Sequence, residues 1–288
     1  MRLLHKMLFS DDIGSLEFEE RWNALATKKS NRMIAGAVAI WEDDPDLTRL
    51  QHLFESARQT GVSLESTEIE AVYSEEDLFA CDILTLQFGG MIRLPPHSLG
   101  TAMKPEEECH LCHLSLLKQI SILDLPPAKY RGDAFVIMVD CEEGMLTIAR
   151  AVSQKFWNVI ESLQIEGVEK RELMNESQDP STRLHQLIIK DSAPELHQTA
   201  KVEKLRICER CGEPMEVYRQ LSVDTRDEEL VFPRFDFRHK PLVHTREVFG
   251  GHTIKTDGNR DLVASGSLYR ELMKAGIRNL AASPAHLL

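Results

Sequence analysis

Two closely spaced pairs of cysteines are the residues of this chain with the most specific chemistry. Two residues separate Cys109 from Cys112, and two separate Cys208 from Cys211. A C-x-x-C turn places two thiolates on one side of a tight loop, where both can ligate one tetrahedral ion at about 2.3 Å. Two such turns form a closed site with four sulfur ligands, which is typical of structural zinc. The sequence therefore predicts one structural Zn2+ per chain, bound by Cys109, Cys112, Cys208 and Cys211.

The two turns are not identical, and other interpretations of them stay open. Gly212 follows the second pair, where a positive φ turns backbone N–H groups toward sulfur. His113 stands at the matching place after the first pair, so His113 or His110 is an alternative ligand. Either pair is also compatible with a redox dithiol. A third possibility is that the thiols bind no metal and pack as small apolar side chains, as we expect for Cys81 and Cys141.

A second cluster of chemically competent residues lies near the C-terminal end. Three histidines share one polar region with two aspartates, and such a set can bind a metal or supply a base, although scattered surface histidines are more common. The residues are His239, His244, His252, Asp236 and Asp257. The chain has no G-x-G-x-x-G, P-loop, G-x-S-x-G or H-E-x-x-H motif. We therefore expect no enzymatic activity, with an enzyme built on residues 236–257 as the less favoured alternative.

The charge of the chain is unevenly distributed. The net charge is −12 overall. Residues 1–108 hold 20 acidic residues and 10 Lys or Arg, which gives −10, whereas the rest holds 26 and 24, which gives −2. An acidic N-terminal part repels phosphate backbones and disfavours nucleic acid. It favours a basic protein partner by electrostatic steering.

The pattern of apolar residues predicts an α+β fold. Apolar runs predict strands at 34–41, 67–73, 83–88, 134–139 and 187–189, and amphipathic spacing predicts helices at 14–29, 150–164 and 265–275. Another helix is expected between Asp44 and Gly61, and Ser74 is an N-cap candidate before Glu75, Glu76 and Asp77. We expect an acidic N-terminal α/β region at 1–104 and a second region at 105–288.

The second region contains an internal similarity. A shift of about 112 residues aligns two N-cap serines, the apolar face of a helix, and a Gly or Asn that tolerates positive φ. The aligned pairs are Ser153 with Ser265, Phe156 with Leu268, Trp157 with Tyr269, Ile160 with Leu272, Ile165 with Ile277, Gly167 with Asn279 and Val168 with Leu280. This predicts two similar knuckle–strand–helix–strand units, at about 105–190 and 200–288. The alternative is chance likeness, because amphipathic helices share this pattern widely.

A cysteine knuckle before each of two similar units resembles the double-CXXCG motif family described in myxobacteria. The segment 262–280, LVASGSLYRELMKAGIRNL, also resembles the closing segment of bacterial immunity-type proteins. The resemblance covers roughly residues 105–285. It implies zinc bound through the two C-x-x-C pairs and, for some members, neutralisation of a toxin from kin cells by direct binding.

These features together favour a non-enzymatic, zinc-stabilised protein-binding protein, of the immunity type that neutralises a bacterial toxin. The alternative is a zinc-containing regulatory or nucleic-acid-associated protein. No run reaches the roughly 18 apolar residues of a membrane helix. His5 and Lys6 interrupt the N-terminal apolar residues, so no signal peptide is expected. We therefore expect a cytoplasmic protein without membrane contact, in which the cysteines stay reduced.

Overall fold

The chain divides into two compact units, Met1–Asp77 with Leu221–Asp227, and Leu78–Gln220 with Glu228–Leu288. The structure is a computed structural model. It describes residues 2–9, 32–34, 37–45, 47–49, 51–52, 55, 64–98, 103–105, 115–141, 144–174, 183–200, 202–210, 214–219, 230–237, 240–249, 254–256, 258 and 260–288. The predicted helix at 14–29 lies outside these residues. Residues 47–49, within the helix expected after Asp44, are helical.

The smaller unit contains an antiparallel sheet. Its strands are β1 (Arg2–Phe9), β2 (Arg32–Ile34), β3 (Ala37–Trp41) and β4 (Leu64–Val72), in the order β2-β3-β1-β4. The guanidinium of Arg2 lies 4.4 Å from the ring centroid of Trp41 and 2.6 Å from a carboxylate oxygen of Asp43. A cation held over an aromatic face and beside a carboxylate ties the start of β1 to the end of β3.

The short helix α3 (Glu75–Ala80) follows β4 and begins as its sequence predicts. Ser74 Oγ accepts a hydrogen bond from the Asp77 N–H at 3.1 Å. The Asp77 carboxylate in turn accepts from the Ser74 N–H at 2.9 Å. This reciprocal pair is a capping box, and it satisfies two backbone donors at the start of the helix.

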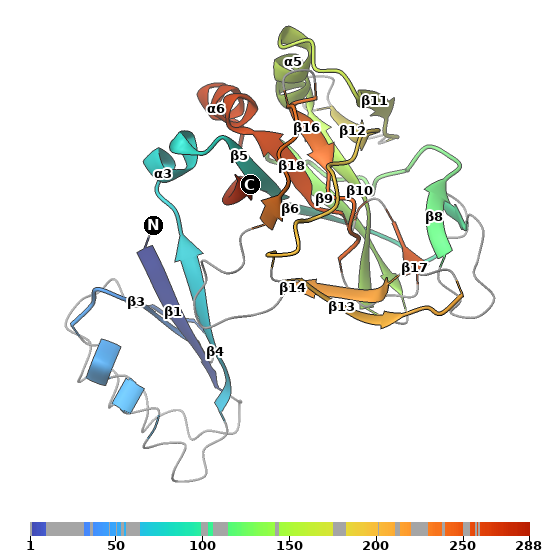
Figure 1. The fold of residues 1–288 in the computed structure, drawn as a ribbon. Helices are drawn as coiled ribbons and strands as arrows, with labels where there is room; N and C mark the ends of the chain where they lie inside the picture. Colours follow the sequence, from blue (N-terminus) through green and yellow to red (C-terminus); the bar gives the residue numbers. More distant parts are fainter. Residues whose placement is uncertain are drawn as a thin grey trace. The chain divides into compact units, whose positions relative to one another are not determined.

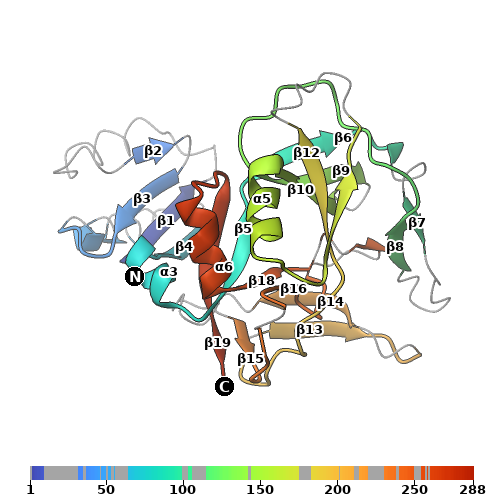
Figure 2. The ribbon, with the colours of Figure 1, turned by 90° about the horizontal axis from the view of Figure 1, so that it is seen from above.

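Two five-stranded sheets form the larger unit within the described residues (Figures 1 and 2). The first sheet has the order β11 (Val168–Glu172), β12 (Leu184–Ile189), β10 (Gly144–Ser153), β9 (Ala134–Cys141), β6 (Gly90–Leu94). The second has the order β15 (Leu230–Phe232), β19 (Leu280–Leu287), β5 (Ile83–Phe88), β18 (Leu262–Ser265), β16 (Leu242–His244). Each sheet carries its own apolar cluster, the first around Ile137 and Leu146 and the second around Phe232 and Val263.

Smaller sheets complete the described part of this unit. β13 (Val202–Ile207) and β14 (Pro214–Arg219) form an antiparallel pair. β8 (Ser115–Gln119) pairs antiparallel with β7 (Met103–Pro105) and parallel with β17 (Ile254–Lys255). β5 and β6 lie before residue 104, yet they pair with strands from the C-terminal two thirds of the chain.

The helices α5 (Gln154–Ser162) and α6 (Gly266–Lys274) follow β10 and β18 and are capped in the same way. Ser153 Oγ accepts from the Phe156 N–H, and Ser265 Oγ accepts from the Leu268 N–H, each at 3.2 Å. Both helices begin as the N-cap serines predict. Phe156 and Leu268 then pack inward, 0% and 1% exposed.

The turns after the two helices are also alike. Gln164 and Gly276 occupy equivalent positions and have φ angles of 51° and 68°. Gly167 and Asn279 are equivalent as well, with φ angles of 76° and 60°. The N–H of Lys190 donates to Gly167 O at 2.8 Å, and the N–H of Gly89 donates to Asn279 O at 2.8 Å. Each turn thus directs the chain into the strand that follows, β11 or β19.

The strands around the two helices occupy equivalent places. β12 lies between β11 and β10, and β5 lies between β19 and β18. The registers match as well: Ser153 pairs with Leu184 and Val168 with Ile189, while Ser265 pairs with Ile83 and Leu280 with Phe88. The chain leaves β5 for the first sheet as β6, and it leaves β12 for the second sheet, where Ser192 bridges His244. The two sheets therefore exchange interior strands. β5 precedes the strands of the first sheet in the chain but belongs to the second sheet, and β12 precedes the C-terminal strands of the second sheet but belongs to the first.

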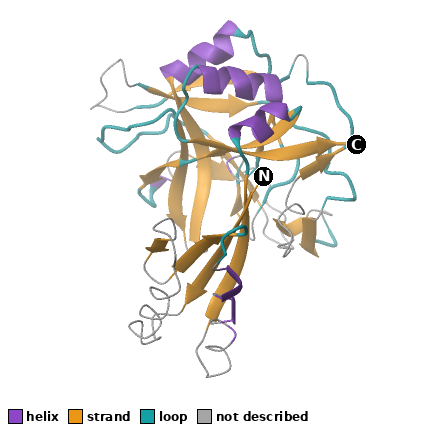
Figure 3. Cartoon of the chain, turned by 90° about the vertical axis from the view of Figure 1, so that its left-hand side faces the viewer, coloured by secondary structure: helices purple, strands orange, loops and turns teal. Residues whose placement is uncertain are grey.

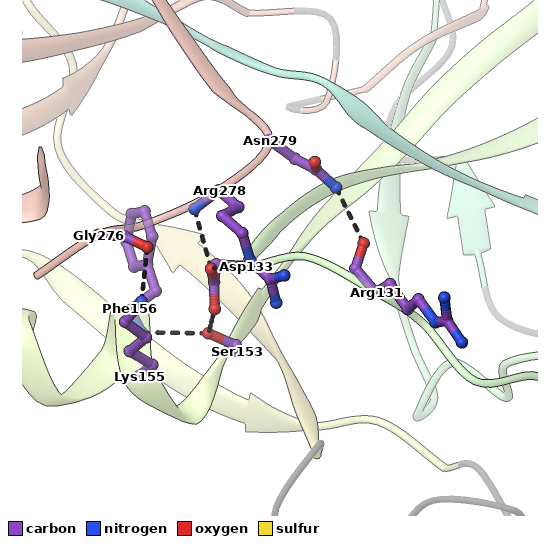
Figure 4. Close-up of polar contacts among 8 residues, drawn as sticks. All are labelled: Arg131, Asp133, Ser153, Lys155, Phe156, Gly276, Arg278 and Asn279. Carbon is purple, nitrogen blue, oxygen red and sulfur yellow. Dashed lines mark hydrogen bonds and ion pairs between the residues drawn. The ribbon is translucent and has the colours of Figure 1, made fainter.

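A polar junction joins the two halves at the helices (Figure 4). The buried carboxylate of Asp133 accepts from Ser153 Oγ at 2.7 Å and from the Arg278 N–H at 2.9 Å. Lys155 Nζ donates to Gly276 O at 2.5 Å. The cap of α5 and the turn after α6 are therefore held by one buried carboxylate, whose charge lies favourably near a helix N-terminus.

The expectation of an α+β fold is wrong, because the described residues form mostly strands in several sheets, with short helices (Figure 3). Stretches that lack a clear period supply many of these strands. β7, β15, β16 and β17 are only two or three residues long, so alternation of apolar and polar residues cannot reveal them. β10 also occupies the first residues of the predicted 150–164 helix, which begins only after the Ser153 cap.

Candidate functional site

In the sequence, the predicted zinc ligands fall between strands that pair with each other. Cys109 and Cys112 lie in the sequence between the antiparallel strands β7 and β8, and Cys208 and Cys211 lie between β13 and β14. Cys208 follows directly on β13 and is buried, with 5% of its surface exposed. Cys109, Cys112 and Cys211 are outside the described residues, so their approach to Cys208 is not seen.

Among the residues that the structure describes, no group of three or more His, Cys, Asp or Glu is placed to hold a metal. Three of the four predicted ligands lie outside those residues, and the zinc site stays a prediction. Of the two other cysteines, Cys81 is half-buried after α3, and Cys141 ends β9.

The predicted histidine region is described only in part. His239, His252 and Asp257 lie outside the described residues, and Asp236 is exposed. His244 lies on β16 and is buried, 6% exposed, with its Nε2 at 3.5 Å from Arg150 Nη1. Burial, and then the guanidinium groups of Arg150 and Arg260, lower the pKa of His244 from 6.5 to about 3. A neutral, buried imidazole of this kind fits a role in packing.

The guanidinium of Arg150 is a cation beside His244, and backbone carbonyls accept other hydrogen bonds from it. Its Nη2 donates to Gly258 O at 3.0 Å and also to Arg260 O. Backbone carbonyls thus accept hydrogen bonds from the half-buried guanidinium that β10 supplies, and these bonds tie Gly258 and Arg260 to the first sheet. Sequence reasoning did not indicate this pairing, because Arg150 and His244 are 94 residues apart.

A polar pocket lies where α5 meets β11 and β12. It has a volume of about 410 Å³ and is lined by Gln154, Lys170, Glu172, Arg183 and His185. Lys170 Nζ donates to Gln154 Oε1 at 2.8 Å and lies 5.6 Å from the Trp157 ring centroid. Arg183 Nη2 donates to Glu172 Oε1 at 3.3 Å.

The strand register brings these pocket residues to one face. Glu172 of β11 pairs directly with His185 of β12, and Lys170 lies two residues before Glu172 on the same side of β11. α5 adds Gln154 at its first position. Sequence reasoning missed this set because it comes from three segments, and only the polar pair His185-Gln186 inside an apolar strand hints at it.

His185 is the least satisfied polar group of the pocket. It is 6% exposed, and its Nδ1 has no hydrogen-bond partner in the described part of the chain. Burial, and then Lys170 and Arg183, lower its pKa from 6.5 to about 4, while Glu172 and Glu161 act in the opposite direction. With a neutral imidazole, two cations and one carboxylate, the pocket side chains carry a net charge of +1.

Comparisons with known proteins assign no family to the chain. No protein-family model matches it, and no curated protein matches it either. The resemblance of its cysteine pairs to double-CXXCG proteins therefore stays a prediction from the sequence. In the part of the chain that the structure describes, every helix is too short or too polar to cross a membrane.

Proposed function

We propose that this chain is a non-enzymatic, zinc-stabilised protein-binding protein of the immunity type. The supporting observation is the placement of the two C-x-x-C pairs. Each pair lies in the sequence between two strands that pair antiparallel, β7 with β8 and β13 with β14. The first pair of strands follows β6 and precedes β9, and the second follows β12 and precedes β16. A hairpin turn is the setting in which two thiolates converge on one ion.

We also propose that the two halves are copies of one ancestral unit. The support is the agreement of helix caps, turn conformations and strand registers at a common offset of 112 residues between the helices, as for Ser153 with Ser265. In a duplicated protein, two equivalent knuckles are natural partners for one shared site with four cysteine ligands. Such a site is closed, which fits a structural ion and no catalytic one.

The proposed partner is a basic protein of the toxin kind that the resemblance implies. The excess of acidic residues before position 108 supports this choice, because complementary charge accelerates encounter and suppresses partners of like charge. Glu75 and Glu76, in the first turn of α3, are exposed members of this acidic set. The same charge opposes a phosphate backbone.

Elemental analysis of the purified protein tests the zinc site. We expect one zinc per chain in the wild type and none in Cys208→Ser. We also expect the Tm of Cys208→Ser to fall by about 10 °C, since each kcal/mol lost shifts Tm by roughly 2–4 °C in domains of 150–250 residues. Cys81→Ser, which removes a thiol outside both pairs, is the control and should keep the metal. A wild-type protein without metal, or equal metal in Cys208→Ser, would overturn the zinc site.

A binding experiment tests the partner independently. The full chain is mixed with the basic product of a neighbouring gene and analysed by size exclusion at about 0.05 M and about 0.3 M salt. We expect a complex at low salt that weakens at high salt, because exposed charges are screened beyond a Debye length. Absence of a complex at low salt with every neighbouring product would remove the support for an immunity role.

A further inference from the structure

We propose that the pocket of Gln154, Lys170, Glu172, Arg183 and His185 binds a small oxyanion, that is, a ligand with a carboxylate or phosphate group. This inference does not depend on the cysteines or on a protein partner. It starts from a cavity in which two cations, Lys170 and Arg183, lie beside an imidazole that is more than nine-tenths buried. The imidazole Nδ1 has no hydrogen-bond partner among the described residues and is itself closed to solvent, so the charged side chains of the cavity supply the contacts to a ligand.

The charges around His185 favour an anion. Lys170 is hydrogen-bonded to the neutral amide of Gln154, so its positive charge is not compensated by that contact. Arg183 is paired with Glu172, whose side chain is 69% exposed. An exposed ion pair contributes little to stability, so the Arg183 guanidinium can exchange Glu172 for a planar oxyanion at a small cost in free energy.

The size of the pocket is that of a site for a small molecule. Its volume of about 410 Å³ lies in the lower part of the usual range for ligand sites. Gln154 and Lys170 are held by their mutual hydrogen bond, and the Lys170 ammonium is also placed over the Trp157 ring. The donors are therefore positioned before a ligand enters, which reduces the entropy cost of binding.

Binding of an oxyanion should be coupled to protonation of His185. The groups that face this imidazole are Lys170 and Glu172 from β11, Arg183 from the residue before β12 and Glu161 from α5. An anion beside Lys170 and Arg183 offsets the two cations that hold His185 neutral, and it favours the imidazolium. Affinity should then rise as the pH falls from 7 toward 5, because the imidazolium adds a third positive charge to the site.

The experiment is an NMR titration of the full chain, with the His185 resonances assigned by comparison with His185→Gln. Sodium acetate and inorganic phosphate are the two probes, and sodium chloride at equal ionic strength is the reference. We expect saturable shifts of His185 with at least one probe, and a rise in its pKa when the probe is bound. Saturation by acetate identifies a carboxylate site, and saturation by phosphate alone identifies a phosphate site.

Two variants of β11 distinguish binding at the pocket from a general effect of surface charge. Lys170→Gln removes the pocket cation, and Arg171→Gln removes a neighbouring charge on the opposite face of β11. We expect Lys170→Gln to weaken binding about tenfold or more, since hydrogen bonds to charged groups contribute about 1.5–3 kcal/mol. It should also raise the pKa of His185 in the absence of anion. Arg171→Gln should bind as the wild type does.

Three results would overturn the proposal. One is the lack of saturable binding by both probes at pH 5 to 7. Another is equal weakening by Lys170→Gln and Arg171→Gln, which indicates screening of surface charge. A third is unchanged affinity in Lys170→Gln while circular dichroism shows that this variant is folded.

Discussion

At the scale of single residues, the buried pair of Arg150 and His244 is the most consequential. His244 is held neutral, with its pKa lowered to about 3, by burial and by two guanidinium groups. Arg150 keeps its charge and is satisfied by the carbonyls of Gly258 and Arg260. The pair therefore joins β10 and β16 to Gly258 and Arg260 only while the imidazole stays unprotonated.

This arrangement predicts acid sensitivity of the larger unit. The unfolded state binds a proton at His244 near pH 6.5 and the folded state near pH 3, so the contribution to stability is present above pH 6.5 and is lost as the pH falls toward 3. At pH 5 the loss from this residue should be about 2 kcal/mol, at 1.36 kcal/mol per pKa unit. Urea unfolding at pH 7 and pH 5 measures it.

The matched variants for this test are His244→Gln and His197→Gln. His244→Gln should show a smaller fall in the free energy of unfolding between pH 7 and pH 5. His197 is only half-buried, and its ring contacts Thr199, two residues along the chain. His197→Gln should therefore show the same fall in the free energy of unfolding as the wild type. An unchanged pH dependence in His244→Gln would show that other groups are responsible; His185, with its pKa lowered to about 4, is the next candidate.

At the scale of elements, α5 and α6 allow a direct comparison of two serine N-caps in one protein. Ser153→Ala and Ser265→Ala each remove a cap and should each cost about 1 kcal/mol. Ser153→Ala should cost more, because Ser153 Oγ also donates to the buried carboxylate of Asp133. Urea unfolding gives both values, and Ser162→Ala, at the exposed end of α5, should change stability by less than about 0.5 kcal/mol. Equal costs for both caps would show that the Asp133 contact contributes nothing.

The elements that could be predicted from the sequence are those with a local signal. Ser153 and Ser265 as caps, and Gly167 and Asn279 as positive-φ turn residues, were predictable because each residue type meets a local backbone need. β5 was predictable because a mostly apolar run favours a strand with buried residues on both faces.

What the sequence could not reveal depends on distant segments. β16 is three residues long and exists because β18 pairs with it. The pocket around His185 needs the pairing of β11 with β12, and the burial of His244 needs Arg150 from another sheet. Neither composition nor periodicity encodes which strands become neighbours, so the predominance of strands was missed.

At the scale of the whole molecule, the exchange of β5 and β12 between the sheets determines how the larger unit is held together. β5 is central in the second sheet although it precedes the first sheet's strands in the chain, and Thr85 Oγ1 bonds Ser283 O across 198 residues. Ile83 and Leu84 of β5 are 2% and 0% exposed. Neither sheet has all of its interior strands unless both halves are present.

This exchange predicts complementation between fragments. A chain divided within residues 175–182 separates β11 from β12, so each fragment lacks an interior strand of one of its sheets, β12 or β5. We expect residues 78–178 and 179–288 to be unfolded or aggregated when expressed alone and to form a folded 1:1 complex when co-expressed. Circular dichroism and size exclusion measure this. A fragment that is folded and monomeric alone, with a cooperative thermal transition, would contradict the prediction.

The position of β5 also has a consequence during synthesis. β5 emerges from the ribosome early, whereas its two neighbours β18 and β19 are among the last strands to be made. At about 5–20 residues per second, this apolar strand waits on the order of ten seconds or more for its partners. A nascent chain with such a strand is a natural client for a chaperone that shields apolar segments. Slow translation of the C-terminal half should therefore lower the yield of folded protein more than slow translation of the first 80 residues.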